Sequence, residues 1–279
     1  MSKKVSIYMT TTVRSEDQWK LLKISLEYAR KWYPIEDIYV INDGSDYMEY
    51  NTLLTEERYK EFDMWDYIIQ KYKVYVIHTD REDPSHQYLK RSGELLRLYY
   101  YLLNPNPTEW AICIHDSQII NSRFPIPKYP ETTPYKFLFK AKHQYDAPIE
   151  EVNLLAKMGS KSLISFYHEN KKDWRIGFGV QCIISHRFLE KVFDKYPRFF
   201  GPFMSEVNTR VDRMCCERLV PVIFASIKPV DSVVFGDIFE YTNKHFNTHW
   251  GYSFEQFMLD GGREIGTFTA PTIKVWVGR

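Results

Sequence analysis

The first third of the chain alternates short apolar runs with longer segments whose apolar residues recur at helical spacing. The run at residues 5–9 is apolar and partly β-branched, as expected of a buried strand. Ser15, with Gln18 three residues later, has the pattern of a helix start, and apolar residues follow it every three or four positions. The alternation continues with predicted strands at 38–41, 74–77 and 110–114 and predicted helices at 56–69 and 89–103.

This alternation predicts parallel strands joined by right-handed crossovers. In such sheets, ligands bind outside the carboxyl ends of the strands. Each of the four predicted strands is followed by polar residues, and three of these segments carry an Asp: residues 10–14, 42–46, 78–81 and 115–117. Solvation alone makes strand ends polar, but four ends rich in Asp, His, Thr and Arg favour a binding edge.

The second half of the chain has a weaker pattern. Residues 121–150 are rich in Pro, Lys and Tyr without periodicity, which predicts a loop region able to cover a site. Arg218 lies within the apolar stripe of its predicted helix, and a buried guanidinium needs a partner, so we expect it to hold an acid on a neighbouring element. The elements predicted here are strands at 161–166 and 180–184 and helices at 188–193 and 207–220.

Composition narrows the class of protein. The 279 residues include 37 Lys and Arg against 36 Asp and Glu, so a nucleic-acid partner or a polybasic membrane binder is not expected. The four cysteines form no CxxC pattern and two are adjacent, which favours reduced thiols in a reducing compartment. No apolar run approaches the roughly 18 residues of a membrane span, and no signal peptide stands out, so we expect a cytoplasmic protein.

The polar strand ends carry a family resemblance. Residues 5–14, the helix after them and the turn Asp43-Gly44-Ser45 after the second strand resemble the start of GT-A glycosyltransferases. Three further segments match. Residues 91–103 are similar to the helix before the family's metal motif, and residues 109–119 are placed like its DXD strand. Gly177-Phe178-Gly179 is similar to its acceptor-side glycine motif.

This resemblance covers roughly residues 4–225. It implies an α/β fold of the GT-A (Rossmann-like) type, with a mixed, mostly parallel sheet flanked by helices. We expect a nucleotide-sugar-binding and catalytic domain at residues 1–225, and a C-terminal extension at 226–279 that completes the site.

The resemblance also implies an activity, the transfer of a sugar from a nucleoside-diphosphate donor to a glycan hydroxyl. A UDP-sugar is the default donor, hexosyl or pentosyl, with xylose as one candidate, and inversion is the preferred outcome. Asp43 could alternatively serve only its own turn. The residues that the resemblance assigns to the donor are Thr11, Arg14, Asp43, Arg91, Asp116 and Ser117.

The metal motif departs from the family. Where the family has Asp-X-Asp to hold Mn²⁺ or Mg²⁺ against the diphosphate, this chain has His115-Asp116-Ser117. Such a set binds a divalent ion more weakly, and the expected ligands are Asp116, His115 and a further histidine, His249 or His245. The alternative is that no metal is used and that Arg or Lys neutralises the diphosphate, with Lys274 and Arg279 as candidates.

Two carboxylates are candidates for the general base. Asp212 and Arg218 match the spacing of the family's catalytic Asp and the Arg that follows it on one helix. Asp212 is expected to be half sheltered at the edge of the apolar stripe, as suits a general base, although a surface ion pair is the plain alternative. Glu206 is the rival base, and it could equally serve the helix terminus.

Other functions find less support in the sequence. A dinucleotide-dependent dehydrogenase would need G-x-G-x-x-G after the first strand, and residues 10–14 contain no glycine. A P-loop motif and the glycine-rich loop of nucleotidyltransferases are missing too. Because the metal motif is degenerate, a catalytically inactive nucleotide-sugar or glycan-binding module of the same fold stays open.

Overall fold

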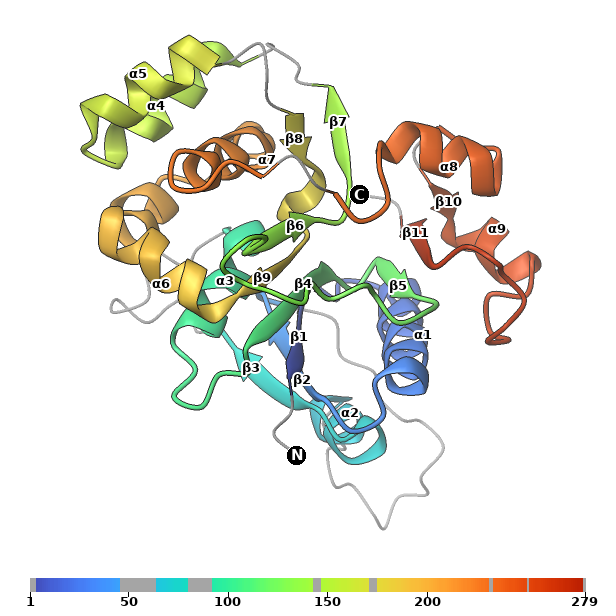
Figure 1. The fold of residues 1–279 in the computed structure, drawn as a ribbon. Helices are drawn as coiled ribbons and strands as arrows, with labels where there is room; N and C mark the ends of the chain where they lie inside the picture. Colours follow the sequence, from blue (N-terminus) through green and yellow to red (C-terminus); the bar gives the residue numbers. More distant parts are fainter. Residues whose placement is uncertain are drawn as a thin grey trace.

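A six-stranded sheet forms the centre of the computed structural model, which describes residues 4–45, 64–79, 92–142, 147–170, 175–230, 233–249 and 251–277. The strand order is β3-β2-β1-β4-β9-β6 (Figure 1). Strands β1 to β4 are mutually parallel, whereas β9 runs antiparallel to both of its neighbours. The strands are β1 (Val5–Thr11), β2 (Asp37–Asn42), β3 (Tyr75–His78), β4 (Trp110–His115), β6 (Tyr135–Phe137) and β9 (Cys182–Ser185).

Helices cover both faces of this sheet. Along β1, Ile7 and Met9 pack into one core with Trp19, whereas Tyr8 faces the other core, as the alternation of side chains along a strand requires. Burial on both faces explains why the predicted strands are continuous apolar runs. One core receives α1 (Glu16–Trp32) and α2 (Met64–Tyr72), and the other α3 (Gly93–Leu102), α4 (Pro148–Lys157), α5 (Lys161–Asn170), α6 (His186–Lys195) and α7 (Arg210–Ala225).

The expected fold class is confirmed, since this is an α/β protein with a mostly parallel sheet flanked by helices. The predicted helix start is confirmed as well, because the Ser15 side chain accepts a hydrogen bond from the backbone N–H of Gln18. All four cysteines are buried and free. Within the described parts of the chain, every helix is too short or too polar to cross a membrane.

The last elements of the chain build a second, three-stranded sheet with β5, next to the end of β4. They are α8 (Ile238–Phe246), β10 (Tyr252–Ser253), α9 (Phe254–Leu259) and β11 (Thr272–Trp276). Strand β11 pairs antiparallel with β5 (Gln118–Ile120), the short strand that directly follows β4, and Lys274 lies opposite Gln118. The C-terminal segment therefore reaches the residues just beyond the end of β4 (Figure 1).

Two predictions for the second half are wrong. Residues 161–166 belong to helix α5, whose buried residues Leu163 and Tyr167 are four positions apart, which is helical spacing. Residues 121–150, expected as a loop region, contain β6, the start of α4 and the strand β7 (Lys140–Lys142), which pairs with β8 (Arg175–Gly177). Strands of three residues are too short to show a period in the sequence.

Candidate active site

The ends of β1, β2 and β4 bring three of the expected donor residues together. Backbone hydrogen bonds continue past the strands, from Asp43 N to Thr11 O (2.8 Å) and from Asp116 N to Thr10 O (3.0 Å). The Thr11 hydroxyl donates to Asp116 Oδ2 at 2.6 Å. Thr11, Asp43 and Asp116 are all buried, so the carboxyl edge of the sheet has a built polar centre.

Asp43 occupies a tightly packed turn. Asn42 supplies the turn's own side-chain bond, since its Oδ1 accepts from Ser45 N at 2.9 Å. A Cβ atom on Gly93, the first residue of α3, would lie only 2.9 Å from Asp43 Oδ2, so glycine lets the helix approach this carboxylate. Asp43 is therefore not needed for the Asx-turn, and its carboxylate faces the start of a helix.

His115 belongs to a hydrogen-bonded web around Gly179. Its Nε2 lies 3.2 Å from Gly179 O, and its Nδ1 lies 3.4 Å from Thr10 Oγ1. The fully buried Arg97 donates to the same two oxygens, at 2.6 Å to Gly179 O and at 3.2 Å to Thr10 Oγ1. Because a carbonyl only accepts, Nε2 is the protonated nitrogen, and the Nδ1 lone pair faces the threonine hydroxyl.

The expected metal ligands do not form a metal site. Both ring nitrogens of His115 are engaged as described, and the Lys274 ammonium lies 2.6 Å from the Ser117 hydroxyl. His249 is exposed and its ring stacks on Phe239 at 4.8 Å. Across the residues that the structure describes, no three His, Cys, Asp or Glu side chains are arranged to hold a metal ion. The set Asp116, His115 and His249 is therefore not brought together as a three-ligand metal site.

A further carboxylate at this edge was missed in the sequence. Glu217, on α7, accepts a hydrogen bond from Gly179 N to its Oε1 at 3.0 Å. Burial, followed by the negative charge of Glu94, raises the pKa of Glu217 to about 7. The one feature of the sequence that points to Glu217 is that this acid, beside Arg218, interrupts an otherwise apolar stretch of the helix. Which way that side of the helix faces depends on tertiary packing.

The two predicted bases have local partners. Asp212 Oδ2 accepts from Thr209 N and Thr209 Oγ1, both at 2.8 Å, and completes the capping box at the start of α7. Glu206 is exposed and forms an ion pair with Lys157 at 2.9 Å. Both carboxylates therefore have structural roles in this arrangement, and their catalytic roles stay predictions.

The expected partner of Arg218 is present. Arg218 Nε lies 3.3 Å from Glu151 Oε1 on α4, and the two side chains are 3% and 0% exposed. The prediction that Arg218 holds an acid on a neighbouring element is confirmed.

Two of the expected donor residues are not part of this centre as described. Arg14 is exposed, and its backbone N–H donates to Gln18 Oε1 at 2.6 Å. Arg91 lies outside the described residues.

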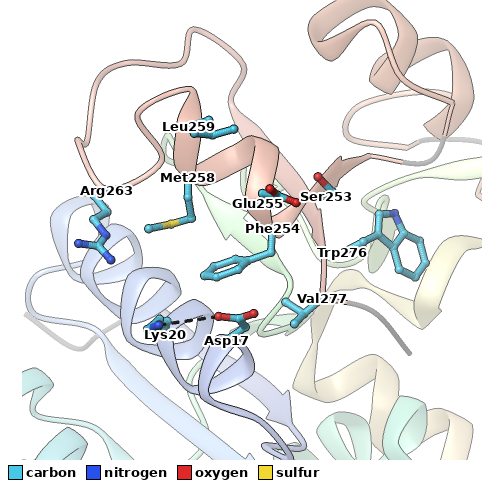
Figure 2. Close-up of a pocket in the computed structure, with 10 residues that line it drawn as sticks. All are labelled: Asp17, Lys20, Ser253, Phe254, Glu255, Met258, Leu259, Arg263, Trp276 and Val277. Atoms are coloured by element: carbon cyan, nitrogen blue, oxygen red, sulfur yellow. Dashed lines mark ion pairs between the residues drawn. The ribbon is translucent and has the colours of Figure 1, made fainter.

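A cleft lies beside Trp276, away from the strand-end residues described above. It has a volume of about 610 Å³ and lies between the first turns of α1 and helix α9. Figure 2 shows Asp17 and Lys20, whose charged groups are 3.9 Å apart, facing Phe254 and Arg263 across it. The indole of Trp276, which lines this cleft, also lies 4.9 Å from the Lys274 ammonium.

No protein-family model and no curated protein matches the sequence. Solved structures match over most of this chain, TarS and CmsA among them. Residues 1–349 of TarS from S. aureus share 12% identity with a TM-score of 0.37, over 80% of this chain and 55% of that one. Core-mannan synthase A (CmsA/Ktr4) from Aspergillus fumigatus, in its Mn/GDP form, shares 12% identity with a TM-score of 0.41, over 78% and 70%. The chain thus spans about half of the TarS structure, and at these TM-scores neither likeness assigns a function.

Proposed function

We propose that this chain is a GT-A glycosyltransferase that moves a sugar from a nucleoside-diphosphate donor to a hydroxyl of a glycan acceptor. The observation that carries the proposal is the Thr11–Asp116 pair between the ends of β1 and β4. In the sheet, β2 and β3 lie on one side of β1 and β4 lies on the other, so the strand order reverses between β1 and β4. Ligands of open parallel sheets bind at this switch point.

The residues at the switch point suit a nucleotide sugar. Carboxylates accept hydrogen bonds, so Asp43 and Asp116 are matched to ribose and sugar hydroxyls and to the N–H groups of a base. We propose a UDP-sugar, hexosyl or pentosyl and with xylose as one candidate, as the donor. Thr11 and Asp43 would hold the nucleoside, and Asp116 the ribose or the sugar.

Glu217 is the carboxylate best placed to act as general base. Its Oε1 is fixed by the backbone of Gly179 at the same edge of the sheet as His115. In an inverting transfer, the base takes the acceptor's hydroxyl proton while that oxygen attacks the anomeric carbon. The bond from that carbon to the phosphate oxygen breaks, and its electrons leave with the nucleoside diphosphate. Asp212 and Glu206 are the rival bases.

The proposal is tested by turnover of nucleotide sugars. The protein is incubated with UDP-, GDP-, TDP- and CMP-sugars, and the released nucleotide is quantified by chromatography. We expect release from a UDP-sugar and a loss of about 100-fold in Asp116→Asn, the size found for removing one polar group from a catalytic site. Asp194→Asn, at an exposed position on α6, is the matched control.

Unchanged turnover in Asp116→Asn would contradict the placement of the site. Binding of a nucleotide sugar without release of the nucleotide would instead favour the inactive binding module of the same fold. Inactivity and lack of binding toward every donor would remove the glycosyltransferase proposal.

A further inference from the structure

The Lys274 ammonium lies beside the His115-Asp116-Ser117 motif, where a metal would be expected in a GT-A site. Ser117 stands where the GT-A motif has its second Asp, and the Lys274 ammonium lies 2.6 Å from the Ser117 hydroxyl. Lys274 is only 6% exposed, and its ammonium also lies over the ring of Trp276. A positive charge is therefore built into this edge of the sheet by the chain itself.

The backbone holds Lys274 in this place. Strand β11 pairs with β5 directly after the motif, and Val275 N donates to Ser117 O at 2.9 Å. Gly251 packs against the same residue, since a Cβ there would lie 2.6 Å from Lys274 O. These contacts fix the backbone of Lys274 on both sides, and its buried side chain is held by the Ser117 hydroxyl and the Trp276 ring.

A divalent cation and this ammonium would compete for the same region. Like charges a few ångströms apart repel strongly in a buried site. The motif leaves few ligands for a metal, because the His115 nitrogens face Thr10 and Gly179 and Asp116 is its one carboxylate. A phosphate group, in contrast, is attracted to an ammonium and accepts hydrogen bonds from a lysine and a serine.

We propose that Lys274 and Ser117 bind the phosphates of the donor directly, so that donor binding requires no divalent metal. This inference rests on the proposed function and concerns the same site. When the bond between the anomeric carbon and the phosphate oxygen breaks, negative charge develops on the leaving diphosphate. The fixed Lys274 ammonium stabilises that charge without reorganisation.

Calorimetric titration with UDP and with GDP tests the inference. The wild-type protein is titrated in EDTA and again with Mn²⁺, and Lys274→Gln and Lys274→Arg are titrated in EDTA. Lys191→Gln, on the exposed surface of α6, is the matched control. We expect equal wild-type affinity in both buffers. Lys274→Gln should lose about 10- to 100-fold, as for a charge-assisted hydrogen bond, and Lys274→Arg should lose less. Inorganic pyrophosphate should displace UDP from the wild type and more weakly from Lys274→Gln.

The outcomes separate the inference from the proposed function. Nucleotide binding that is lost in EDTA would overturn the metal-free site and keep the glycosyltransferase, even if Lys274→Gln failed to fold. Binding in EDTA that is the same in Lys274→Gln and the Lys191→Gln control would overturn the role of Lys274. Absence of nucleotide binding in both buffers would remove the proposed function together with the inference.

Discussion

At the scale of single residues, Gly179 organises the site. Its carbonyl accepts from Arg97 and His115, and its N–H donates to Glu217. Its φ of +61° favours glycine, and a Cβ there would lie 3.3 Å from the His115 ring. One backbone position thus sets the tautomer of a histidine and the orientation of a carboxylate, which the sequence motif Gly177-Phe178-Gly179 alone does not reveal.

The Glu217 carboxyl is expected to set the pH dependence of transfer. Its pKa is raised to about 7, chiefly by burial, and a base acts only when deprotonated. The rate should therefore rise with pH through about 7 and level off above it. Glu217→Gln keeps the oxygen that accepts from Gly179 N and should lower the rate by about 10²- to 10⁴-fold. It should also abolish this part of the pH profile, measured as nucleotide release at saturating donor.

Asp212→Asn and Glu206→Gln are the matched comparisons. Both remove a carboxylate that has structural partners, so we expect the pH profile to persist in each. If one of them loses the profile while Glu217→Gln keeps it, the base has been assigned to the wrong residue.

At the scale of elements, the strands and helices with long buried segments are the ones whose apolar pattern is clear in the sequence. Strands β1, β2 and β4 are buried on both faces and α1 is amphipathic with a side-chain cap, so all four are predictable from apolar runs and helical spacing. Strands of three residues such as β6 carry no detectable period. The polar edge of the sheet is predictable for the same reason, because polar residues directly after apolar runs gather where parallel strands end.

The parts of the site that escaped prediction depend on packing between distant elements. Glu217 reaches Gly179 only because α7 packs on β8 and the turn after it, η2 (Phe178–Val180). His115 looks like a metal ligand in the sequence, but Thr10 and Gly179 engage both of its nitrogens. Lys274 and Arg279 are the two candidate cations; the pairing of β11 with β5 brings Lys274 to Ser117, whereas Arg279 lies outside the described residues.

The Arg218–Glu151 ion pair is expected to hold α7 against α4. Both side chains are buried, and Tyr167 also donates to the Glu151 carboxylate at 2.6 Å. Arg218→Met leaves this carboxylate buried without its cation and should lower the free energy of unfolding by about 3–5 kcal/mol. Urea denaturation followed by circular dichroism measures the change. The double variant Arg218→Met/Glu151→Gln should recover part of the loss, and equal losses in both variants would contradict a coupled pair.

At the scale of the whole molecule, two distant parts of the chain build one edge. The first 116 residues supply the switch point between β1 and β4, and the last elements return to place Lys274 and Trp276 beside it. The Lys274 ammonium lies 2.6 Å from the Ser117 hydroxyl, directly after the end of β4. The C-terminal segment is therefore expected to take part in the site and not merely to extend the fold.

The central claim is that a nucleotide sugar binds at the carboxyl edge of the sheet, and hydrogen exchange with and without saturating UDP-sugar tests it most directly. Amide protection is measured by mass spectrometry on the intact chain. The account predicts slower exchange in residues 10–14, 42–45, 115–118 and 272–276. Little change is expected in α6, which packs in the core that contains Tyr8. Absence of protection throughout, or protection confined to α6 or to α9, would contradict it.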